Sequence, residues 1–436
     1  MKAASNTNPG PKRTTLQNRR QFIKSAATLS AAMAAAPAVV TGQGAPRLFK
    51  VGLIGSGRRA RGAFENLRNA AKSLRVEIRL VATADFFLDQ AQTAAKKYGA
   101  DEKFAFGGAA SYKQLLETAC DLVILAAPPA FRPVHVAAAV AAGKHIFAEK
   151  PVAVDPPGIR QFLAAATSAK AKKLALVAGT QRRHQATYLR QALALQKGQL
   201  GKILGGTLYW CQARGSIRPR RETDTNAGYM ANNWMNWAEM SGDHIVEQHV
   251  HNIDVANWFI GRPPLTALGV GARLRRPTGN QYDFFSVDYD YGEGVHVHSL
   301  SRQIPGCYSR VGEFLTTDVA EIMGGGKVRR FHGKEVTFED VGHEGDPYVQ
   351  EHADLLKSIL DGNVLNEGEN VATSTATAIM GRISAYTGQI VRLSDLLTQT
   401  ESPFYNLAFK PAALDFEGAS DIELPAENKA PVPGKD

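Results

Sequence analysis

The sequence predicts an α/β fold: a Rossmann-type doubly wound parallel sheet followed by an α+β domain with an open, mostly antiparallel sheet. A Gly-x-Gly turn, Gly55-Ser56-Gly57, directly follows the apolar run 50–54, as the first strand-to-helix turn of such a sheet requires. Short apolar runs then alternate with helical segments as far as about residue 180. After Arg190 apolar and polar residues alternate singly, which is typical of half-buried antiparallel strands.

Five apolar runs of strand length predict the parallel sheet. Helical segments such as 88–98 and 134–142 separate them. Strands that alternate with helices form a parallel sheet covered on both faces, so a ligand is expected in the crevice at their carboxyl ends. The predicted strands are 51–54, 78–84, 122–127, 145–148 and 174–178.

The second half is predicted to contain five strands of a different kind. One helix, 244–259, interrupts them, and a helical pair, 348–360 and 372–387, follows them. Their period-2 pattern predicts a sheet with one buried and one open face. The predicted strands are 203–209, 265–274, 284–291, 294–302 and 314–322.

These changes of pattern divide the chain into four parts without any internal repeat. They are a leader (1–46), a first domain (47–180), a second domain (181–400) and a Pro-rich tail (401–436) expected to be largely irregular. With 436 residues, 44% of them hydrophobic and 21% charged, the chain can bury a sizeable core.

The leader resembles a twin-arginine export signal. Arg19 and Arg20 precede a weakly apolar, Ala-rich stretch, 25–40, with an Ala-x-Ala-like site around Ala36-Pro37-Ala38. A disordered basic arm is the alternative interpretation. The leader predicts a periplasmic or otherwise exported protein that crosses the membrane already folded around its ligand.

Charge and cysteine content exclude several classes of partner and site. The formal net charge of +10 falls to +4 without the six Lys and Arg residues of the leader, so no nucleic-acid footprint is expected. No segment approaches a mature membrane span. The three cysteines, Cys120, Cys211 and Cys307, lack metal-site spacing, and Cys120 is expected in the core.

The Gly-x-Gly turn predicts a dinucleotide site. Such a turn lets backbone N–H groups at a helix N-terminus approach a pyrophosphate, where the helix dipole favours negative charge. Gly55, Ser56, Gly57, Arg58 and Arg59 are therefore predicted cofactor-binding residues. Ala60 takes the place of the third glycine, which a close helix–strand contact tolerates.

Asp85 ends the second predicted strand, where the adenosine ribose is expected to lie. Its carboxylate would accept hydrogen bonds from both ribose hydroxyls and repel a 2′-phosphate, which favours NAD over NADP. The 30 residues from Gly55 to Asp85 exceed the roughly 20 usual for this pattern, and a long first helix explains the excess. A helix-capping aspartate is the alternative.

Lys150 follows the strand 145–148 and precedes Pro151, which cannot continue a central strand. Its ammonium group is thus expected to face the crevice. There it can donate to a substrate hydroxyl and stabilise negative charge that develops on the oxygen. A surface lysine is the alternative, because most lysines are exposed.

A second group of chemistry-bearing residues lies in the predicted helix 244–259. Glu247, His251, Asp254 and Trp258 fall on one helical face, with Ser241 or Asp243 as the cap. A neutral imidazole beside a carboxylate can accept the proton of an alcohol. A metal site is disfavoured because His249 points roughly opposite to His251.

Together these features resemble the Gfo/Idh/MocA oxidoreductase family from Leu48 to about Leu397. The resemblance implies a first domain that binds NAD(P) and a second that binds sugars or polyols and forms oligomer contacts. The motifs that carry it are the Gly-x-Gly turn, Asp85, the segment from Pro128-Pro129 to His135, Ala142–Pro151 with Glu149-Lys150-Pro151, and the block Glu247–Asp254.

The same resemblance implies residue roles. It places Lys150 beside the nicotinamide, makes His251 the catalytic histidine, and adds Pro128, His135 and Glu149 to the cofactor site. The family more often has Asp where this chain has Glu247, which changes the reach of that carboxylate.

Arg183, Trp237 and Asp254 are the predicted substrate-binding residues. Arg183 belongs to the run 181–184 after the last parallel strand, and Trp237 precedes the catalytic helix. Trp234 and Trp237 could stack on a sugar ring, although aromatic residues more often serve packing.

The predicted function is hydride transfer to or from a carbinol of a sugar, glycoside or polyol, with NAD tightly bound and no metal. An exported enzyme has no dinucleotide pool, which suggests redox-neutral chemistry. The alternative is an NAD-dependent glycosidase that acts through a transient keto sugar. A noncatalytic sugar sensor is disfavoured by the retained lysine, histidine and carboxylates. The open sheet predicts a homo-oligomer.

Overall fold

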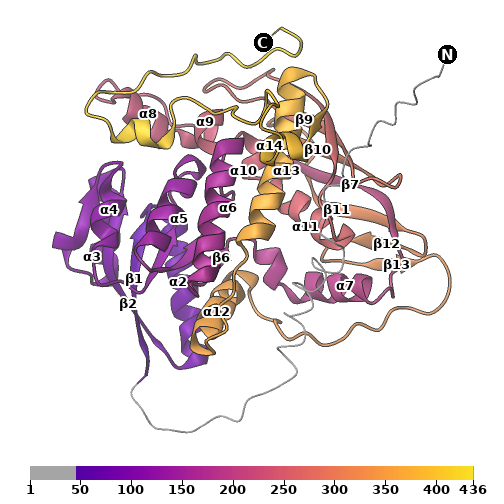
Figure 1. Cartoon of the computed structure of the whole chain (residues 1–436), viewed down its shortest axis with the longest axis horizontal. Helices are drawn as coiled ribbons and strands as arrows, with labels where there is room; N and C mark the ends of the chain where they lie inside the picture. The colour runs from indigo at the N-terminus through magenta and orange to yellow at the C-terminus, as the bar shows by residue number, and fades with distance from the viewer. Residues whose placement is uncertain (1–45, 436) are drawn as a thin grey trace, which may run out of the picture. The chain divides into compact units, whose positions relative to one another are not determined.

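The computed structural model describes residues 46–435. The predicted twin-arginine signal lies outside the described residues. The described residues form one compact unit, with a parallel sheet in its first half and a larger mixed sheet in its second (Figure 1).

The first sheet has six strands, all parallel, in the order β3-β2-β1-β4-β5-β6. This confirms the doubly wound fold and all five predicted strands. The additional strand, β3, has three residues, too short to show a hydrophobic period. The strands are β1 (Leu48–Ile54), β2 (Glu77–Asp85), β3 (Ala105–Gly107), β4 (Leu122–Leu125), β5 (His145–Ala148) and β6 (Leu176–Ala178).

Helices cover both faces of this sheet. Helix α2 has 17 residues, which accounts for the long separation between Gly55 and Asp85. The helices and 3-10 turns of this half are α2 (Arg58–Leu74), α3 (Leu88–Tyr98), η1 (Glu102–Phe104), α4 (Ser111–Leu116), η2 (Pro129–Phe131), α5 (Arg132–Ala141), α6 (Pro156–Ala171) and η3 (Gln181–His184).

A helix from the C-terminal part of the chain also packs on the first sheet. In α12 (Pro347–Leu360), Leu355 and Leu356 are fully buried in one cluster with Phe49 and Val51 of β1. The backbone N–H of Leu176 also donates to the carbonyl of Leu365. The predicted second domain therefore contributes part of the first domain's core.

The second sheet has eight strands in the order β13-β12-β11-β7-β10-β9-β8-β14. Only the β7–β10 pair is parallel, so the sheet is mostly antiparallel, as predicted. The predicted strand 314–322 is instead a hairpin of β11 and β12. The strands are β7 (Ile203–Gln212), β8 (Thr266–Ala272), β9 (Phe284–Asp290), β10 (His296–Gln303), β11 (Arg310–Thr317), β12 (Ala320–Met323), β13 (Val328–Arg330) and β14 (Val391–Arg392).

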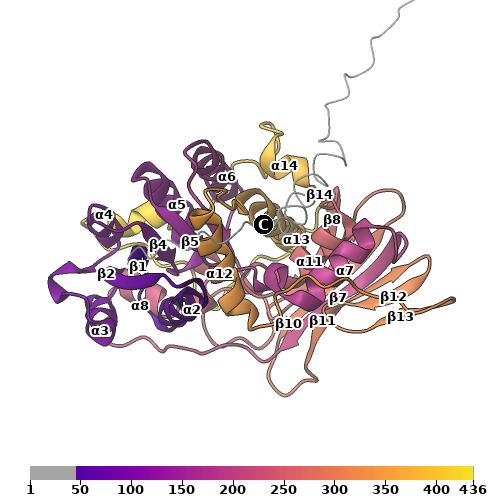
Figure 2. The ribbon, with the colours of Figure 1, turned by 90° about the horizontal axis from the view of Figure 1, so that it is seen from below.

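Helices pack on one face of the second sheet (Figure 2). Phe285, Val287 and Tyr289 of β9 are fully buried on this covered face, whereas Leu268 and Val270 of β8 are more than half exposed on the other. The helices and turns of this half are α7 (Ala186–Gln196), α8 (Asn226–Asn232), η4 (Trp234–Asn236), α9 (Ala238–Ser241), α10 (His244–Glu247), α11 (Val250–Ile260), α13 (Gly368–Thr387) and α14 (Leu393–Leu397).

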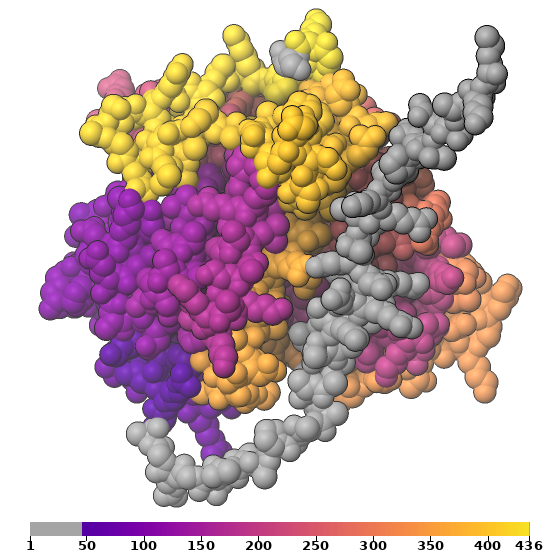
Figure 3. Space-filling view, in the orientation of Figure 1, coloured from indigo at the N-terminus to yellow at the C-terminus, as the bar shows by residue number. Residues whose placement is uncertain are grey.

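The tail is mostly irregular, as predicted. Its described residues form one regular element, the 3-10 turn η5 (Ala413–Glu417). Figure 3 shows the tail lying along the edge of the first domain. Cys120 is buried, also as predicted, and all three cysteines are free. Within residues 46–435, no helix is both long and apolar enough to cross a membrane.

Gly55 is the position in the predicted turn where a side chain is least tolerated. Its φ is +83°, and a Cβ atom there would lie 2.2 Å from the backbone nitrogen of Ala127. We expect Gly55→Ala to lower the free energy of unfolding by at least about 2 kcal/mol, through strain and overlap.

Gly62, exposed in helix α2, provides the matched control. A Cβ there would meet no atom within 4 Å, so Gly62→Ala should raise the free energy of unfolding by about 0.5–1 kcal/mol. Denaturant unfolding of both variants measures the two effects. Equal effects would contradict the close approach at Gly55.

Candidate active site

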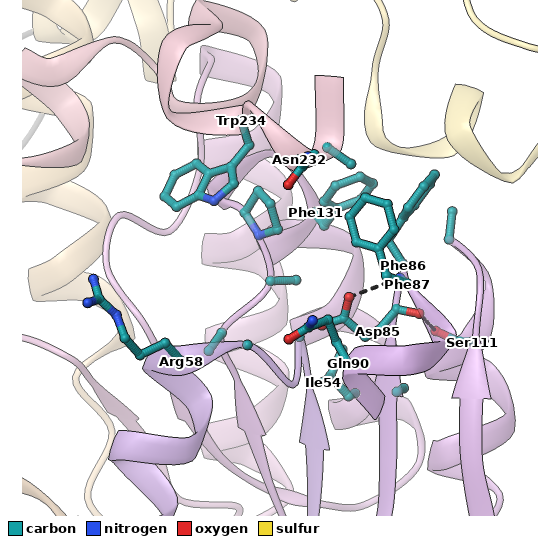
Figure 4. Close-up of a pocket in the computed structure, with 18 of the residues that line it drawn as sticks. Ile54, Arg58, Asp85, Phe86, Phe87, Gln90, Ser111, Phe131, Asn232 and Trp234 are labelled. Atoms are coloured by element: carbon teal, nitrogen blue, oxygen red, sulfur yellow. Dashed lines mark hydrogen bonds between the residues drawn. The ribbon is translucent and has the colours of Figure 1, made fainter. Parts of the chain in front are cut away.

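A cavity of about 920 Å³ lies at the carboxyl ends of β1, β2 and β4, where the sequence predicts the ligand crevice. The opposite wall comes from the second half of the chain, with Ser216, Arg218, Arg221 and residues 231–235. Figure 4 shows Asp85 near the ends of the strands, with Asn232 and Trp234 across the cavity from it. The cavity thus lies between the two halves.

The N-terminus of helix α2 has the properties of an anion site. Gly57 is its N-cap and provides no side-chain hydrogen bond, whereas Asp155 and Asp346 cap helices α6 and α12. Because the first N–H groups of a helix have no partner within it, those of α2 are available to a pyrophosphate. Gly55, Gly57 and Arg58 line the cavity, so the described residues here fit a dinucleotide.

Ser56, unlike Gly55, Gly57 and Arg58, does not line the cavity. Its side chain is fully buried, and its hydroxyl donates to the carbonyl of Ala84 over 3.1 Å. Its backbone N–H donates to Asp85 Oδ2 over 2.7 Å. Ser56 therefore fixes the turn against the end of β2 and does not direct its side chain into the cavity.

Asp85 lines the cavity and is positioned by two backbone N–H groups. Oδ2 accepts from Ser56, and Oδ1 accepts from Phe87 over 3.0 Å. Burial raises the pKa of this carboxyl above its usual value, and the two hydrogen bonds oppose that shift. Each oxygen keeps a second lone pair, so the carboxylate can still accept the ribose hydroxyls.

We expect Asp85→Ser to reduce the preference for NAD over NADP about tenfold or more. Hydrogen bonds to a charged group contribute about 1.5–3 kcal/mol, and the repulsion of a 2′-phosphate is lost as well. The ratio of kcat/KM for the two cofactors measures the change. Glu77→Ser, at the exposed start of the same strand, should leave the ratio within twofold.

Aromatic and apolar groups line the cavity next to β4. Pro128, Phe131 and His135 all contribute, and the His135 ring stacks on Phe131 with centroids 5.8 Å apart. Burial, and secondarily the charge of Arg132, lowers the pKa of His135 to about 3, so its ring is neutral. These side chains form a wall suited to a flat, uncharged ring.

Arg59 and Glu149 are paired rather than directed at the cavity. Arg59 Nη2 lies 2.5 Å from Glu149 Oε1, and the guanidinium stacks over Tyr348 at 5.0 Å. Glu149 is buried against the backbone of Gly179. The pair therefore ties helix α2 to the end of β5, immediately before Lys150.

Lys150 lies against Glu247, which is 97 residues away in the sequence. Lys150 Nζ is 3.1 Å from Glu247 Oε1 and also donates to the backbone carbonyl of Glu247. The predicted helix 244–259 is broken here: α10 ends at Glu247 and α11 begins at Val250. The break leaves the Glu247 carbonyl without a helical partner, so the ammonium can bind it. Asp243 caps α10, as predicted.

His251 lies close enough to Lys150 to be affected by its charge. Burial, and then the charges of Lys150, Arg182 and Arg59, lower its pKa well below the usual 6.5. Its ring stacks on Trp210 with centroids 5.7 Å apart. Among the described residues, neither ring nitrogen has a hydrogen-bond partner, so this neutral imidazole is available to a substrate.

The strand order arranges these groups in one line. Asp85 ends β2, Gly57 follows β1, Pro128 follows β4 and Lys150 follows β5, and these four strands are adjacent in that order. Three strand spacings separate Asp85 from Lys150, or roughly 14 Å. Lys150, Glu247 and His251 do not line the cavity, which therefore corresponds to the adenosine half of an extended dinucleotide.

Two of the predicted substrate residues bind each other. Arg183 forms a bidentate pair with Asp254, with Nε 2.9 Å from Oδ2, and Ser374 also donates to Asp254. Both side chains are thereby engaged in holding η3 to α11. The neighbouring Arg182 instead approaches the site: its guanidinium is 5.9 Å from the Trp210 ring and pairs with the buried Glu313.

The third predicted substrate residue, Trp237, is fully buried and packs edge-on against Tyr229. It has no face available to a sugar, so its side chain serves the core, which corrects the prediction of a stacking role. Trp234 lines the cavity instead. Trp210, which the sequence analysis missed, contacts His251 directly; its position on the covered face at the end of β7 was the available signal.

The histidine-rich block does not gather around a metal. His249 Nε2 is 2.7 Å from Ser299 Oγ, deep in the second half of the molecule. Across residues 46–435, no group of three or more His, Cys, Asp or Glu residues could hold a metal ion.

Comparisons with known proteins agree with this geometry. The chain is 25% identical over 241 residues to inositol 2-dehydrogenase of Rhizobium meliloti, covering 55% of this chain and 63% of the relative. It is 28% identical over 222 residues to D-glucoside 3-dehydrogenase of Escherichia coli, covering 50% and 56%. Less than two thirds of either relative is therefore matched.

A solved structure shows the same fold at low identity. The WlbA dehydrogenase of Bordetella pertussis, in complex with NADH and UDP-GlcNAcA, superposes with a TM-score of 0.63 at 17% identity. The match covers 79% of this chain and 99% of that one.

Family models match both halves of the chain. Residues 49–177 match the oxidoreductase family with an NAD-binding Rossmann fold, and residues 188–330 match the GFO/IDH/MocA C-terminal domain. The NAD-binding domain and the mixed-sheet domain that follows it thus match domains of one family. The chain belongs to the Gfo/Idh/MocA family of oxidoreductases.

Proposed function

We propose that this protein transfers a hydride between NAD and a carbinol of a sugar, glycoside or polyol. The observation that carries the proposal is the arrangement around Lys150: its ammonium is held by Glu247, next to a histidine kept neutral by burial. Inositol 2-dehydrogenase and D-glucoside 3-dehydrogenase, the two curated relatives, support a polyol or sugar as the substrate class.

Each residue of the site has its own role in the proposed reaction. Bound NAD supplies the hydride acceptor or donor. Lys150 has three N–H donors, and Glu247 takes two, so the third can bind the substrate oxygen and stabilise its developing negative charge. His251 accepts the hydroxyl proton during oxidation and returns it during reduction. Trp210 holds the imidazole plane through stacking.

We further propose export by the twin-arginine route and a cofactor that stays bound through each cycle. The proposal is supported by Arg19 and Arg20 before the Ala-rich stretch of the leader. An exported enzyme without a dinucleotide pool must return its cofactor to the starting state, either with a second sugar or by eliminating an aglycone from a transient keto sugar.

We also propose that the open face of the second sheet pairs with another copy of the chain. Leu268, Val270 and Met323 are 51%, 62% and 43% exposed on that face. Exposed apolar patches of this kind are typical of association surfaces. Native mass spectrometry of Val270→Glu beside the parent protein would report a change from oligomer to monomer.

Purified protein tested against free sugars, polyols and aryl glycosides distinguishes the reactions. Nicotinamide absorbance and aglycone release are followed together. Reduced cofactor in stoichiometric yield, or paired sugar products, supports hydride transfer between carbinols, whereas aglycone release without net reduction supports the glycosidase. Bound NAD with no turnover of any substrate would contradict both and favour a noncatalytic sensor.

A further inference from the structure

We infer that the C-terminal segment 398–432, here called the C-terminal strap, holds the two walls of the cofactor cavity together and thereby slows release of the dinucleotide, with Phe416 as the main positioning residue. The inference rests on the proposed NAD-dependent function. The C-terminal strap lies outside both family-model matches, the second of which ends at residue 330.

The C-terminal strap is anchored at its start on the first domain. The Arg160 guanidinium of helix α6 donates to the carbonyl of Tyr405 and stacks on its ring at 3.6 Å. The backbone N–H of Phe409 donates to Asp155 at the start of the same helix. These contacts fix the segment before it reaches the cavity.

At η5 the C-terminal strap packs behind the wall of the cavity. The Phe416 ring is 5.2 Å from that of Phe131 and 6.4 Å from that of Phe86, both of which line the cavity. Glu417 accepts from the hydroxyl of Tyr112, a third lining residue, over 3.0 Å, and pairs with Lys113 at 2.5 Å. Phe416 is buried in one cluster with Phe131, and Phe86 packs against that cluster.

Beyond η5 the C-terminal strap binds the opposite wall. Asp421 accepts from the backbone N–H groups of Asn226 and Ala227 at the start of α8, over 2.7 and 2.9 Å. Glu427 accepts from the hydroxyls of Tyr229 and Thr278. Helix α8 leads directly into residues 231–235, which line the cavity.

One segment therefore contacts both sides of the adenosine half of the site, and it crosses from one to the other (Figures 1 and 3). A dinucleotide leaves this cavity most readily when the two walls separate. Contacts that join the walls raise the free energy of that opening. Loss of these contacts should therefore mainly increase the rate at which the dinucleotide dissociates.

The test uses the full chain loaded with NADH and chased with excess NAD, with nicotinamide fluorescence reporting release. Phe416→Ala is expected to raise the dissociation rate at least tenfold and to raise KM for NAD, with kcat at saturating NAD within twofold. Phe416→Leu should restore most of the slow release. The matched control is Leu414→Ala in the same short turn, because Leu414 is 58% exposed, and its rate should stay within twofold.

A dissociation rate within twofold of the parent in a folded Phe416→Ala protein would overturn the inference. If that variant does not fold, Asp421→Asn, which weakens the contact with α8 from an exposed position, should still raise the rate severalfold. An unchanged rate there would overturn the inference too. A parent protein that binds no NADH would contradict the proposed function itself.

Discussion

Replacing His251 with asparagine is expected to lower kcat for carbinol oxidation by about 10²–10⁴-fold, the usual contribution of a positioned general base. The imidazole is buried and neutral, and no described residue competes for its ring nitrogens. Asparagine keeps a polar group of similar reach but cannot accept the proton. Steady-state kinetics at saturating NAD and substrate measures the loss.

The pH profile of kcat/KM distinguishes a general-base role of His251 from a purely structural role. Since the pKa of His251 is lowered well below 6.5, the base stays neutral at pH 6.5, and the fall of kcat/KM towards acid should lie below that pH. The fall should disappear in His251→Asn. His298→Asn, on the open face of the second sheet, should change neither kcat nor the profile. A loss below tenfold in His251→Asn would exclude the general-base role.

Lys150→Met is expected to lower kcat by about 10²–10³-fold, as loss of one preorganised donor to a developing oxyanion does. Methionine preserves the length and volume of the side chain but removes the charge. Oε1 and the backbone carbonyl of Glu247 then lose this donor in a nearly buried site, although Gln248 still donates to Oε2. Single-turnover reduction of bound NAD measures the hydride-transfer step itself.

Three further variants test the role of the Lys150 ammonium group. Lys150→Arg keeps the charge but not the compact geometry, so it should recover only part of the rate. Lys96→Met, on the exposed side of helix α3, should have the parent rate. The combined His251→Asn and Lys150→Met variant should lose less than the product of the single losses, because the groups act on one oxygen. Full activity in Lys150→Met would contradict the proposed site.

The parts of the fold set by local pattern were predictable from the sequence. The five parallel strands, helix α3 at residues 88–98 and the glycine turn all depend on periodicity or on a backbone conformation that few residues allow. Asp85 was placed correctly at the cavity because it is the last residue of a recognisable strand.

What depends on long-range packing was not predictable. The break after Glu247, where the carbonyl accepts from the distant Lys150, leaves no mark in the hydrophobic periodicity. Adjacent residues of a 3-10 turn point about a third of a turn apart, so the sequence did not indicate that Arg182 lies over Trp210 while Arg183 pairs with Asp254. The hairpin within 314–322 turns at Asp318 and Val319, without glycine or proline to mark it.

The burial of Trp237 was also not predictable from the sequence. Nothing local distinguishes it from Trp234, yet one is enclosed by Tyr229 and Met240 while the other lines the cavity. Likewise α12 was predicted as a helix, but its place on the first sheet reflects the route of the chain, which hydrophobic periodicity does not encode.

A crystal structure of the protein loaded with NADH tests the central claim most directly. The account predicts the adenosine ribose on Asp85, the pyrophosphate at the N-terminus of α2, and the nicotinamide in contact distance of both Lys150 and His251. Two results would contradict the account. One is a nicotinamide bound at the β3 side of the sheet, and the other is a bound dinucleotide whose nicotinamide contacts neither Lys150 nor His251.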